Sequence, residues 1–380
     1  MRGKWREVHL GDVAEIVMGQ SPPGSTYNES GDGLPFFQGV KDFGYRNPTP
    51  RVFCSRPSRV AQLGDILFSV RAPIGRVNIA DRECTIGRGL SIIQPRDKAG
   101  SRYIEFALRY LEPTWQAIEG GGSVFGNATR QDVELLSLTW PDEVSDRRII
   151  AEVLGSLDDK IELNRRMNAT LESMARAVFK AWFMENEEAK GWKAGTIYED
   201  FSLIMGQSPP GKTYNEEKMG IPFFQGRADF GFRFPTNRVY CTAPTRFAKP
   251  GDTLVSVRAP VGDINMVAEK CAIGRGVAAI RHKTGSRSYT YYSMHMLKEE
   301  FNRFEAEGTV FGSINKADFQ ALKVKIPPPD KVLGFEEICY PIDQQVENNK
   351  KQSYTLASLR DALLPRLMSG EMRVRDSVNQ

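Results

Sequence analysis

The stretch that begins Gly19-Gln20-Ser21-Pro22-Pro23-Gly24 and ends Ile86-Gly87-Arg88-Gly89 decides the fold, because the chain contains it twice. The second copy begins Gly206-Gln207-Ser208-Pro209-Pro210-Gly211 and ends Ile273-Gly274-Arg275-Gly276. The offset is 187 residues throughout, and 43 of the 71 positions are identical in both copies. Solenoid repeats have much shorter periods, of about 20–50 residues. The chain therefore contains one domain in two copies.

Within each copy, short apolar runs alternate with Gly and Pro, which predicts a small, irregular, mostly β domain. In the first copy the runs predict strands at 34–38, 51–54, 66–70, 77–79 and 86–93. The last of these would carry Gly87-Arg88-Gly89 in its interior. Helical spacing follows at 102–116.

Each copy is followed by a long segment with heptad spacing. From about 145 to 183 apolar residues alternate at intervals of four and three, and a matching seam runs from about 332 to 372. Asn164 and Asn349 occupy the same heptad place, at an offset of 185, and are expected to fix the register. Pro365 is expected to interrupt and bend the second helix.

Two equivalent units usually associate about a two-fold axis, which makes these helices antiparallel and places the globular domains at opposite ends. The alternative is that each seam packs on its own domain. We expect an α+β chain of two similar, mostly β globular domains separated by two long antiparallel helices that form a coiled coil with pseudo-two-fold symmetry. The expected boundaries are 1–143 and 188–329 for the domains, 144–187 and 330–372 for the helices, and 373–380 for a polar tail.

Composition excludes several classes of protein. No apolar run reaches the roughly 20 residues that a membrane helix requires, and no signal core follows the basic start, so we expect a cytoplasmic protein. The five cysteines form no Cys-x-x-Cys pattern and are expected to be reduced and buried in strands, without zinc. None of the three histidines recurs in both copies, which excludes a duplicated histidine-based active site. The net charge of +4 permits an acidic partner without requiring one.

This plan resembles the specificity subunit of type I restriction-modification enzymes. The resemblance rests on Gly64-Asp65-Ile66-Leu67-Phe68-Ser69-Val70-Arg71 with Gly75, on its repeat from Gly251 to Arg258 with Gly262, on a Gly-Ser/Thr-x-Phe-Gly segment before each helix, and on the helices. It implies two target recognition domains, each reading half of a split double-stranded DNA site. It also implies that the helices act as a spacer and dock two methyltransferase subunits, which restriction subunits can join.

The same resemblance implies that this chain is not an enzyme and binds no cofactor of its own. S-adenosylmethionine would belong to the methyltransferase subunits, and ATP and Mg to the restriction subunit. The family's two recognition domains often differ widely, whereas these are close copies. We therefore expect the two half-sites to be related, so that the target is near-palindromic with an unread spacer.

DNA readers need Arg or Lys for phosphates and Arg, Lys, Gln or Asn for base edges. Residues of these types lie on Gly-flanked loops of both copies, and some positions differ between the copies. The candidate DNA-binding residues are Gln38, Lys41, Arg46, Arg71, Arg76, Arg88, Gln225, Arg227, Arg233, Arg258 and Arg275. Alternatively, the arginines at 71, 88, 258 and 275 could hold the domains together through Asp65 and Asp252.

Two other functions stay open from the residues alone. One is a DNA-modifying enzyme with its own active site, although neither a methyltransferase Asn/Asp-Pro-Pro-aromatic motif nor a Walker A loop is present. Glu216-Glu217-Lys218 resembles part of a nuclease motif, but the first copy reads Glu29-Ser30-Gly31 there, so a solvated surface is expected. The other is a DNA-binding scaffold without methyltransferase partners.

Overall fold

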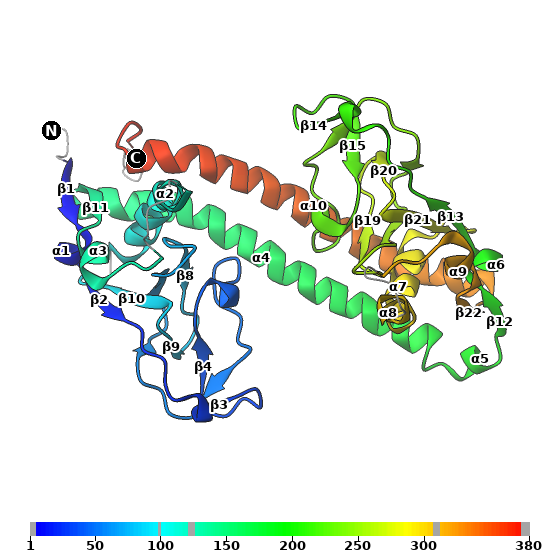
Figure 1. The fold of residues 1–380 in the computed structure, drawn as a ribbon, viewed down its shortest axis with the longest axis horizontal. Helices are drawn as coiled ribbons and strands as arrows, with labels where there is room; N and C mark the ends of the chain where they lie inside the picture. Colours follow the sequence, from blue (N-terminus) through cyan, green and yellow to red (C-terminus); the bar gives the residue numbers. More distant parts are fainter. Residues whose placement is uncertain (1–4, 98–99, 121–125, 307–311, 374–380) are drawn as a thin grey trace, which may run out of the picture. The chain divides into compact units, whose positions relative to one another are not determined.

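A computed structural model describes residues 5–97, 100–120, 126–306 and 312–373 (Figure 1). The chain divides into two compact units, the first formed by residues 1–163 with 352–380 and the second by residues 164–351. Each long helix contributes one part to each unit. The ranges that lie outside the described residues include 121–125 and 307–311, which contain most of the two Gly-Ser/Thr-x-Phe-Gly segments, and 374–380 of the expected tail.

The described residues of the first unit form three sheets. Their strand orders are β1-β11, β2-β10-β7-β8 and β3-β5-β4-β9-β6. The elements before the long helix are β1 (Trp5–His9), α1 (Leu10–Val13), β2 (Ala14–Met18), η1 (Gly24–Thr26), β3 (Tyr27–Asn28), β4 (Leu34–Phe37), η2 (Val40–Asp42), β5 (Phe53–Cys54), β6 (Val60–Ala61), β7 (Ile66–Ser69), β8 (Val77–Ile79), β9 (Cys84–Ile86), β10 (Leu90–Pro95), α2 (Ser101–Gly120), α3 (Arg130–Glu134) and β11 (Ser137–Pro141).

The second unit repeats this topology, with sheets β12-β22, β13-β21-β18-β19 and β14-β16-β15-β20-β17. Its elements are α5 (Glu187–Lys190), β12 (Lys193–Thr196), α6 (Ile197–Asp200), β13 (Phe201–Met205), η4 (Gly211–Thr213), β14 (Tyr214–Asn215), β15 (Ile221–Phe224), η5 (Arg227–Asp229), β16 (Tyr240–Cys241), β17 (Phe247–Ala248), β18 (Thr253–Ser256), β19 (Ile264–Met266), β20 (Cys271–Ile273), β21 (Val277–His282), α7 (Arg287–Met296), α8 (Lys298–Ala306), α9 (Lys316–Ala321) and β22 (Lys323–Ile326). The duplicated sequence thus produces a duplicated fold.

The strand that follows Gly64-Asp65 is buried on both faces. Ile66 and Phe68 of β7 enter a core that includes α2, whereas Leu67 enters a separate core with Ile86 and Leu90. A strand between two cores needs apolar residues at every position, so its sequence does not alternate. In the second unit, Leu254 and Val255 of β18 divide between two cores in the same way.

One predicted strand was wrong. The run 86–93 is two strands in different sheets, because β9 pairs with β4 and β6 whereas β10 pairs with β2 and β7. The N–H of Leu90 donates to the carbonyl of Gly87 (3.1 Å), which closes a turn over Gly87-Arg88-Gly89. Because the residues on both sides of this turn are apolar, the sequence pattern did not reveal the break between β9 and β10.

The two long helices are α4 (Val144–Phe183) and α10 (Pro329–Met368). Pro365 does not interrupt α10, which continues to Met368. In the second unit Asn349 Nδ2 donates to Asn168 Oδ1 (2.8 Å), and Asn164 Nδ2 donates to the carbonyl of Asn349 (3.3 Å). The seam therefore contains the asparagine pair that the heptads predict, joined by Asn168.

The helices run antiparallel within each unit. In the second unit Asn168 contacts Val346, and Arg233 joins Glu172, further along α4, to Asp343, earlier in α10. In the first unit α4 and the end of α10 share a core that contains Ile150, Leu154, Leu363, Leu367 and Met368. The helices also pack on their own domains, since Ile150 and Leu154 of α4 share a core with Phe68 of β7 and Phe106 of α2. The long helices therefore pack on each other and also on the domains.

All five cysteines are free and buried, and four lie in β5, β9, β16 and β20, as expected. Burial raises the pKa of the Cys84 and Cys271 thiols to about 12. Within the described ranges no group of three His, Cys, Asp or Glu residues could hold a metal ion. None of the helices there is long and apolar enough to cross a membrane.

Candidate nucleic-acid interface

Loops from distant parts of the first unit meet at one hollow, which we call the loop hollow. Its lining includes three predicted residues, Gln38, Arg71 and Arg88. Lys41 lines the adjoining depression together with Gln38. All four side chains are exposed. Ser21, which the prediction missed, also lines the hollow, and its Oγ accepts from the N–H of Arg88 (3.3 Å).

Backbone contacts explain why these loops meet. Gly87 N–H donates to the carbonyl of Phe37 (2.9 Å), and Val70 N–H donates to the carbonyl of Gly89 (2.9 Å). A Cβ on Gly89 would lie 2.2 Å from the carbonyl oxygen of Gln38. Only glycine permits that approach, so the Gly-Arg-Gly sequence holds Arg88 against the loop of Gln38.

The second unit reproduces this arrangement around Gln225, Arg258 and Arg275. Val257 N–H donates to the carbonyl of Gly276, Gly276 N–H donates to the carbonyl of Gln225, and Arg275 N–H donates to Ser208 Oγ, over 2.9, 3.0 and 3.2 Å. The side chains of Gln225, Arg258 and Arg275 are exposed, like their equivalents in the first unit.

Each of the two loop clusters contains two arginines whose side chains form no hydrogen bond or ion pair with any other described residue. These arginines are Arg71 and Arg88 in the first unit and Arg258 and Arg275 in the second. The alternative in which Asp65 and Asp252 hold them does not occur. Asp65 instead accepts from Gln94 Nε2 (2.8 Å), and Asp252 accepts from Arg281 Nε (2.6 Å). Exposed guanidinium groups beside a glutamine amide are suited to phosphate and base-edge contacts.

Two further predicted residues, Arg76 and Arg227, are half exposed and form ion pairs. Arg76 Nη1 lies 2.6 Å from Glu112 Oε1 of α2. Arg227 pairs with Asp263, which also lies 3.2 Å from Lys298 Nζ. Burial raises the pKa of Asp263, but hydrogen bonds from Arg227 and Lys298 outweigh it and lower that pKa overall. Both arginines lie next to the loops with part of their charge already neutralised.

Arg46 and Arg233 do not belong to the candidate interface, because their side chains face the long helices. The guanidinium of Arg233 is 1% exposed and contacts Asp343 (2.6 Å), Glu172 and the Tyr292 hydroxyl (2.6 Å). Burial would lower the pKa of Arg233, but Asp343 and the neighbouring groups raise it well above its ordinary value. Extraction of this cation would leave the buried carboxylate of Asp343 without a cation, whereas Glu172 would keep Arg176 at 2.9 Å.

Arg46, the equivalent of Arg233, also faces the helices. It pairs with Asp159 of α4, and its Nη2 lies 3.7 Å from Glu105 of α2. The sequence contains a sign of this role for Arg233 only, because Asp158 and Asp343 occupy equivalent places in the two long helices, one residue after a seam position. Both acids are buried and require a cation, which Arg360 and Arg109 supply to Asp158 and Arg233 supplies to Asp343.

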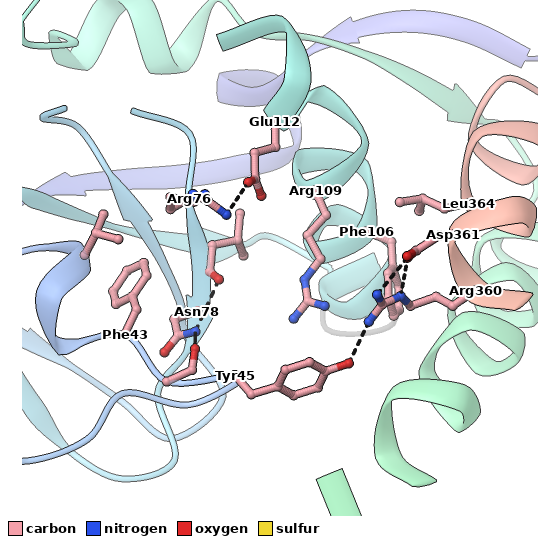
Figure 2. A pocket seen from close by; sticks show the side chains of 13 residues that line it. Phe43, Tyr45, Arg76, Asn78, Phe106, Arg109, Glu112, Arg360, Asp361 and Leu364 are labelled. Carbon is pink, nitrogen blue, oxygen red and sulfur yellow. Dashed lines mark hydrogen bonds and ion pairs between the residues drawn. The ribbon is translucent and has the colours of Figure 1, made fainter. Parts of the chain in front are cut away.

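A cavity of about 440 Å³ lies behind these residues in the first unit. Figure 2 shows Tyr45 and Arg360 meeting on one side of it and Arg76 and Glu112 on the other. Arg360 Nη1 donates to Tyr45 Oη (2.8 Å) and to Asp158 Oδ1 (2.5 Å). The charged side chains that line the cavity form ion pairs, Arg76 with Glu112, Arg360 with Asp361 and Asp158, and Arg109 with Glu105 and Asp158, and these pairs join the domain to the helices.

Comparison with known proteins agrees with this geometry. A family model described as "Type I restriction modification DNA specificity domain" matches residues 2–173 and 190–353. The chain is 28% identical over 339 residues to the putative type I restriction enzyme MjaX specificity subunit of Methanocaldococcus jannaschii, covering 82% of this chain and 79% of the relative. It is 26% identical over 421 residues to the MjaIX specificity subunit of that organism, covering 98% and 94%.

The fold is also that of a solved structure. The crystal structure of a type I restriction-modification S subunit from M. genitalium matches with a TM-score of 0.62 at 16% identity. The match covers 97% of this chain and 96% of that one. The expected pairing of two similar α+β domains with two long helices is therefore confirmed.

Proposed function

Because this chain belongs to the family of type I restriction-modification DNA specificity subunits, we propose that it reads a double-stranded DNA target made of two half-sites. The family is the non-catalytic component of such systems, so the reading of DNA is the activity to explain. One observation carries the proposal. Two equivalent loop clusters each present a glutamine and two exposed arginines that no described residue neutralises.

The two half-sites are related but differ where the loops differ. Asn47 and its equivalent Phe234 are internal, since Asn47 bonds the carbonyl of Ile79 and Phe234 is buried. The differences that reach the surface beside these loops include Val40-Lys41 against Arg227-Ala228 and Arg76 against Asp263. We propose a near-palindromic target whose halves diverge at the bases nearest these residues, with an unread spacer between them.

The partners we propose are two methyltransferase subunits, which would bind S-adenosylmethionine, and restriction subunits, which would bind ATP and Mg. The modest net charge of +4 supports this assembly. Each neutralised phosphate requires a cation, so partner subunits would supply much of the contact with the DNA backbone.

A transplant of the differing loop tests the proposal. Arg227 does not stand alone, because it pairs with Asp263, which also contacts Lys298. The transplant must therefore carry all the equivalent changes: Val40→Arg, Lys41→Ala, Arg76→Asp and Glu112→Lys. In cells that carry the complete system, sequencing of methylated DNA should show a split motif for the wild type. The transplant should convert the motif into a perfect palindrome.

Ser25→Lys is the matched control, since it also introduces the residue of the second copy but lies outside the loop hollow. It should leave the motif unchanged. Two wholly dissimilar half-sites in the wild type, or a transplant that keeps the wild-type motif, would contradict the proposal. Turnover of DNA by the purified chain alone would favour an enzyme, and failure to purify with a methyltransferase subunit would favour a stand-alone scaffold.

A further inference from the structure

A second hollow, in the second unit, has no role in the reading of DNA described above. It encloses about 880 Å³. Ser202 and Ile204 of β13 line one side, and Phe247 of β17 lines the other. Both strands are the last of their sheets. The hollow is thus a groove between two sheet edges, and we call it the edge groove.

Basic side chains surround the edge groove. Arg246 and Lys249 are exposed, and their side chains contact no other described residue through a hydrogen bond or ion pair. Lys270 Nζ lies 4.8 Å from the centre of the Phe247 ring. Among the basic side chains of the groove, Arg281 alone forms an ion pair within the described part of the chain, with Asp252 at 2.5 Å. The lining residues together carry three net positive charges.

The first copy does not have this charge. At the equivalent positions it has Gln62 for Lys249, Glu83 for Lys270 and Gln94 for Arg281, and the whole equivalent set carries two net negative charges. Val60 replaces Phe247. A feature needed to bind each half-site would occur in both copies, so this groove fits a partner that the chain contacts once.

One end of the groove, at Arg246, lies beside the loop cluster of its own unit, because the N–H of Ile273 donates to the carbonyl of Arg246 (3.0 Å) two residues before Arg275. The other end, at Asp252 and Arg281, lies away from that cluster. β18 ends just before Arg258 and begins just after Asp252, so its two ends are about 13 Å apart at roughly 3.3 Å per residue. Arg275 precedes β21, whereas Arg281 lies near its end. The loop arginines and the part of the edge groove around Asp252 and Arg281 therefore occupy opposite ends of the same paired strands.

The groove has an apolar component that a sugar-phosphate backbone would not use. Ile204 is 44% exposed and Phe247 is 38% exposed. Ser202 and Ile204 are the cross-strand partners of Arg281 and Ala279, so all four side chains lie on one face of the sheet. An extended segment laid across this face can place alternate side chains on its apolar and its basic residues. The volume lies within the usual range for binding pockets, about 300–1,000 Å³.

We propose that the edge groove binds an extended peptide segment of a partner protein, in which acidic residues alternate with apolar ones. The acidic side chains meet Arg246, Lys249 and Lys270, and the apolar ones cover Ile204 and Phe247. This partner contact goes beyond the reading of DNA and does not depend on it.

Fluorescence anisotropy with the full-length chain tests the proposal. The probe is a labelled 12-residue peptide that alternates Glu with Val, and the reference probes replace Glu with Lys or Val with Ser. The wild type should bind the Glu/Val peptide at least tenfold more tightly than either reference. The variant Lys249→Gln/Lys270→Glu, which introduces the residues of the first copy, should weaken that binding at least tenfold.

The control variant Lys212→Gln/Lys316→Glu makes the same change in net charge at exposed lysines outside the groove, and it should change the affinity less than twofold. Equal binding of all three peptides, or equal loss in both variants, overturns the proposal. A site-free DNA duplex is added as a competitor. If that duplex displaces the peptide fully and loses affinity for Lys249→Gln/Lys270→Glu, the groove contacts phosphates and the peptide assignment is wrong.

Discussion

Arg233 Nη1 donates a hydrogen bond to Asp343 Oδ1 over 2.6 Å, and both side chains are completely buried. This contact ties the loop after η5 to helix α10. The cation of this contact is Arg233, a residue whose sequence context predicted a DNA-binding arginine. Burial changes its role, because a paired buried charge cannot leave its partners without a large cost.

Arg233→Met should destabilise the second unit by about 3–5 kcal/mol, because it leaves the fully buried Asp343 without a cation. Chemical denaturation followed by tryptophan fluorescence measures this, since Trp182 and Trp192 pack on the core of that unit. The matched control is Arg275→Met at an exposed position, which should change the free energy of unfolding by less than about 0.5 kcal/mol. Equal losses in the two variants would show that Arg233 is not a structural cation.

Arg88→Ala should weaken binding of the assembled complex to its methylation target by about 1–3 kcal/mol if the guanidinium pairs with a base edge. The loss should concern one half-site, and Arg275→Ala should affect the other. Affinities measured on targets with either half-site altered, at several salt concentrations, separate base contacts from phosphate contacts. A phosphate contact would lower the salt slope by about one.

The control for this measurement is Arg82→Ala. Arg82 is exposed, pairs with its neighbour Asp81 (3.0 Å) and lies before β9, whereas Arg88 follows it. It should bind as the wild type does. If Arg88→Ala also bound both half-sites with unchanged affinity, Arg88 would not belong to the interface.

The pair Arg76–Glu112 in the first unit corresponds to Asp263–Lys298 in the second, with the two charges exchanged. Arg76→Asp alone should destabilise the first unit, because it places a carboxylate beside Glu112. Arg76→Asp with Glu112→Lys should restore stability. The coupling energy in a double-mutant cycle should be about 0.5–1 kcal/mol, the upper part of the range for partly exposed pairs. A coupling near zero would mean that the exchange has no energetic basis.

His295 should make stability depend on pH. Its ring lies 4.5 Å from that of Tyr291, and Arg176 Nη2 lies 3.3 Å from its Nδ1. Burial lowers the pKa of His295 from 6.5 to about 3, and nearby cations act in the same direction. Since the folded pKa is below the unfolded one, the unfolded chain binds the extra proton between about pH 6.5 and 3. Stability is therefore lost as pH falls through that window, by up to about 1.4 kcal/mol per pH unit.

His295→Gln should remove this contribution, so the variant should gain stability relative to the wild type between about pH 7 and pH 5. Denaturation of both proteins across that range measures the slope. Met296→Gln, at an exposed and non-titrating neighbour, should keep the wild-type slope. Parallel curves for the wild type and His295→Gln would refute the assignment.

Local sequence was sufficient for much of this architecture. The repeat at an offset of 187 residues predicts two copies of one fold, and the heptads predict α4, α10 and the asparagines between them. Glycine also placed part of the interface, because a residue flanked by glycines can lie where two loops touch, as Arg88 does. These features depend on neighbours within a few residues or on spacing along one helix.

Other features depended on partners that are distant in the chain. Arg46 and Arg71 both lie in loops of the first copy, yet Arg46 meets Asp159 and Arg71 meets no described carboxylate. The run through Gly87-Arg88-Gly89 has the sequence pattern of one strand but divides between two sheets. Its first part, β9, pairs with β4, whereas its second part, β10, pairs with β2. Sequence by itself determined which residues could carry charge and which segments could be strands or helices. The tertiary structure decided which charges are buried and neutralised, because that depends on carboxylates distant in the sequence, such as Asp159 for Arg46 and Asp343 for Arg233, which are 113 and 110 residues away.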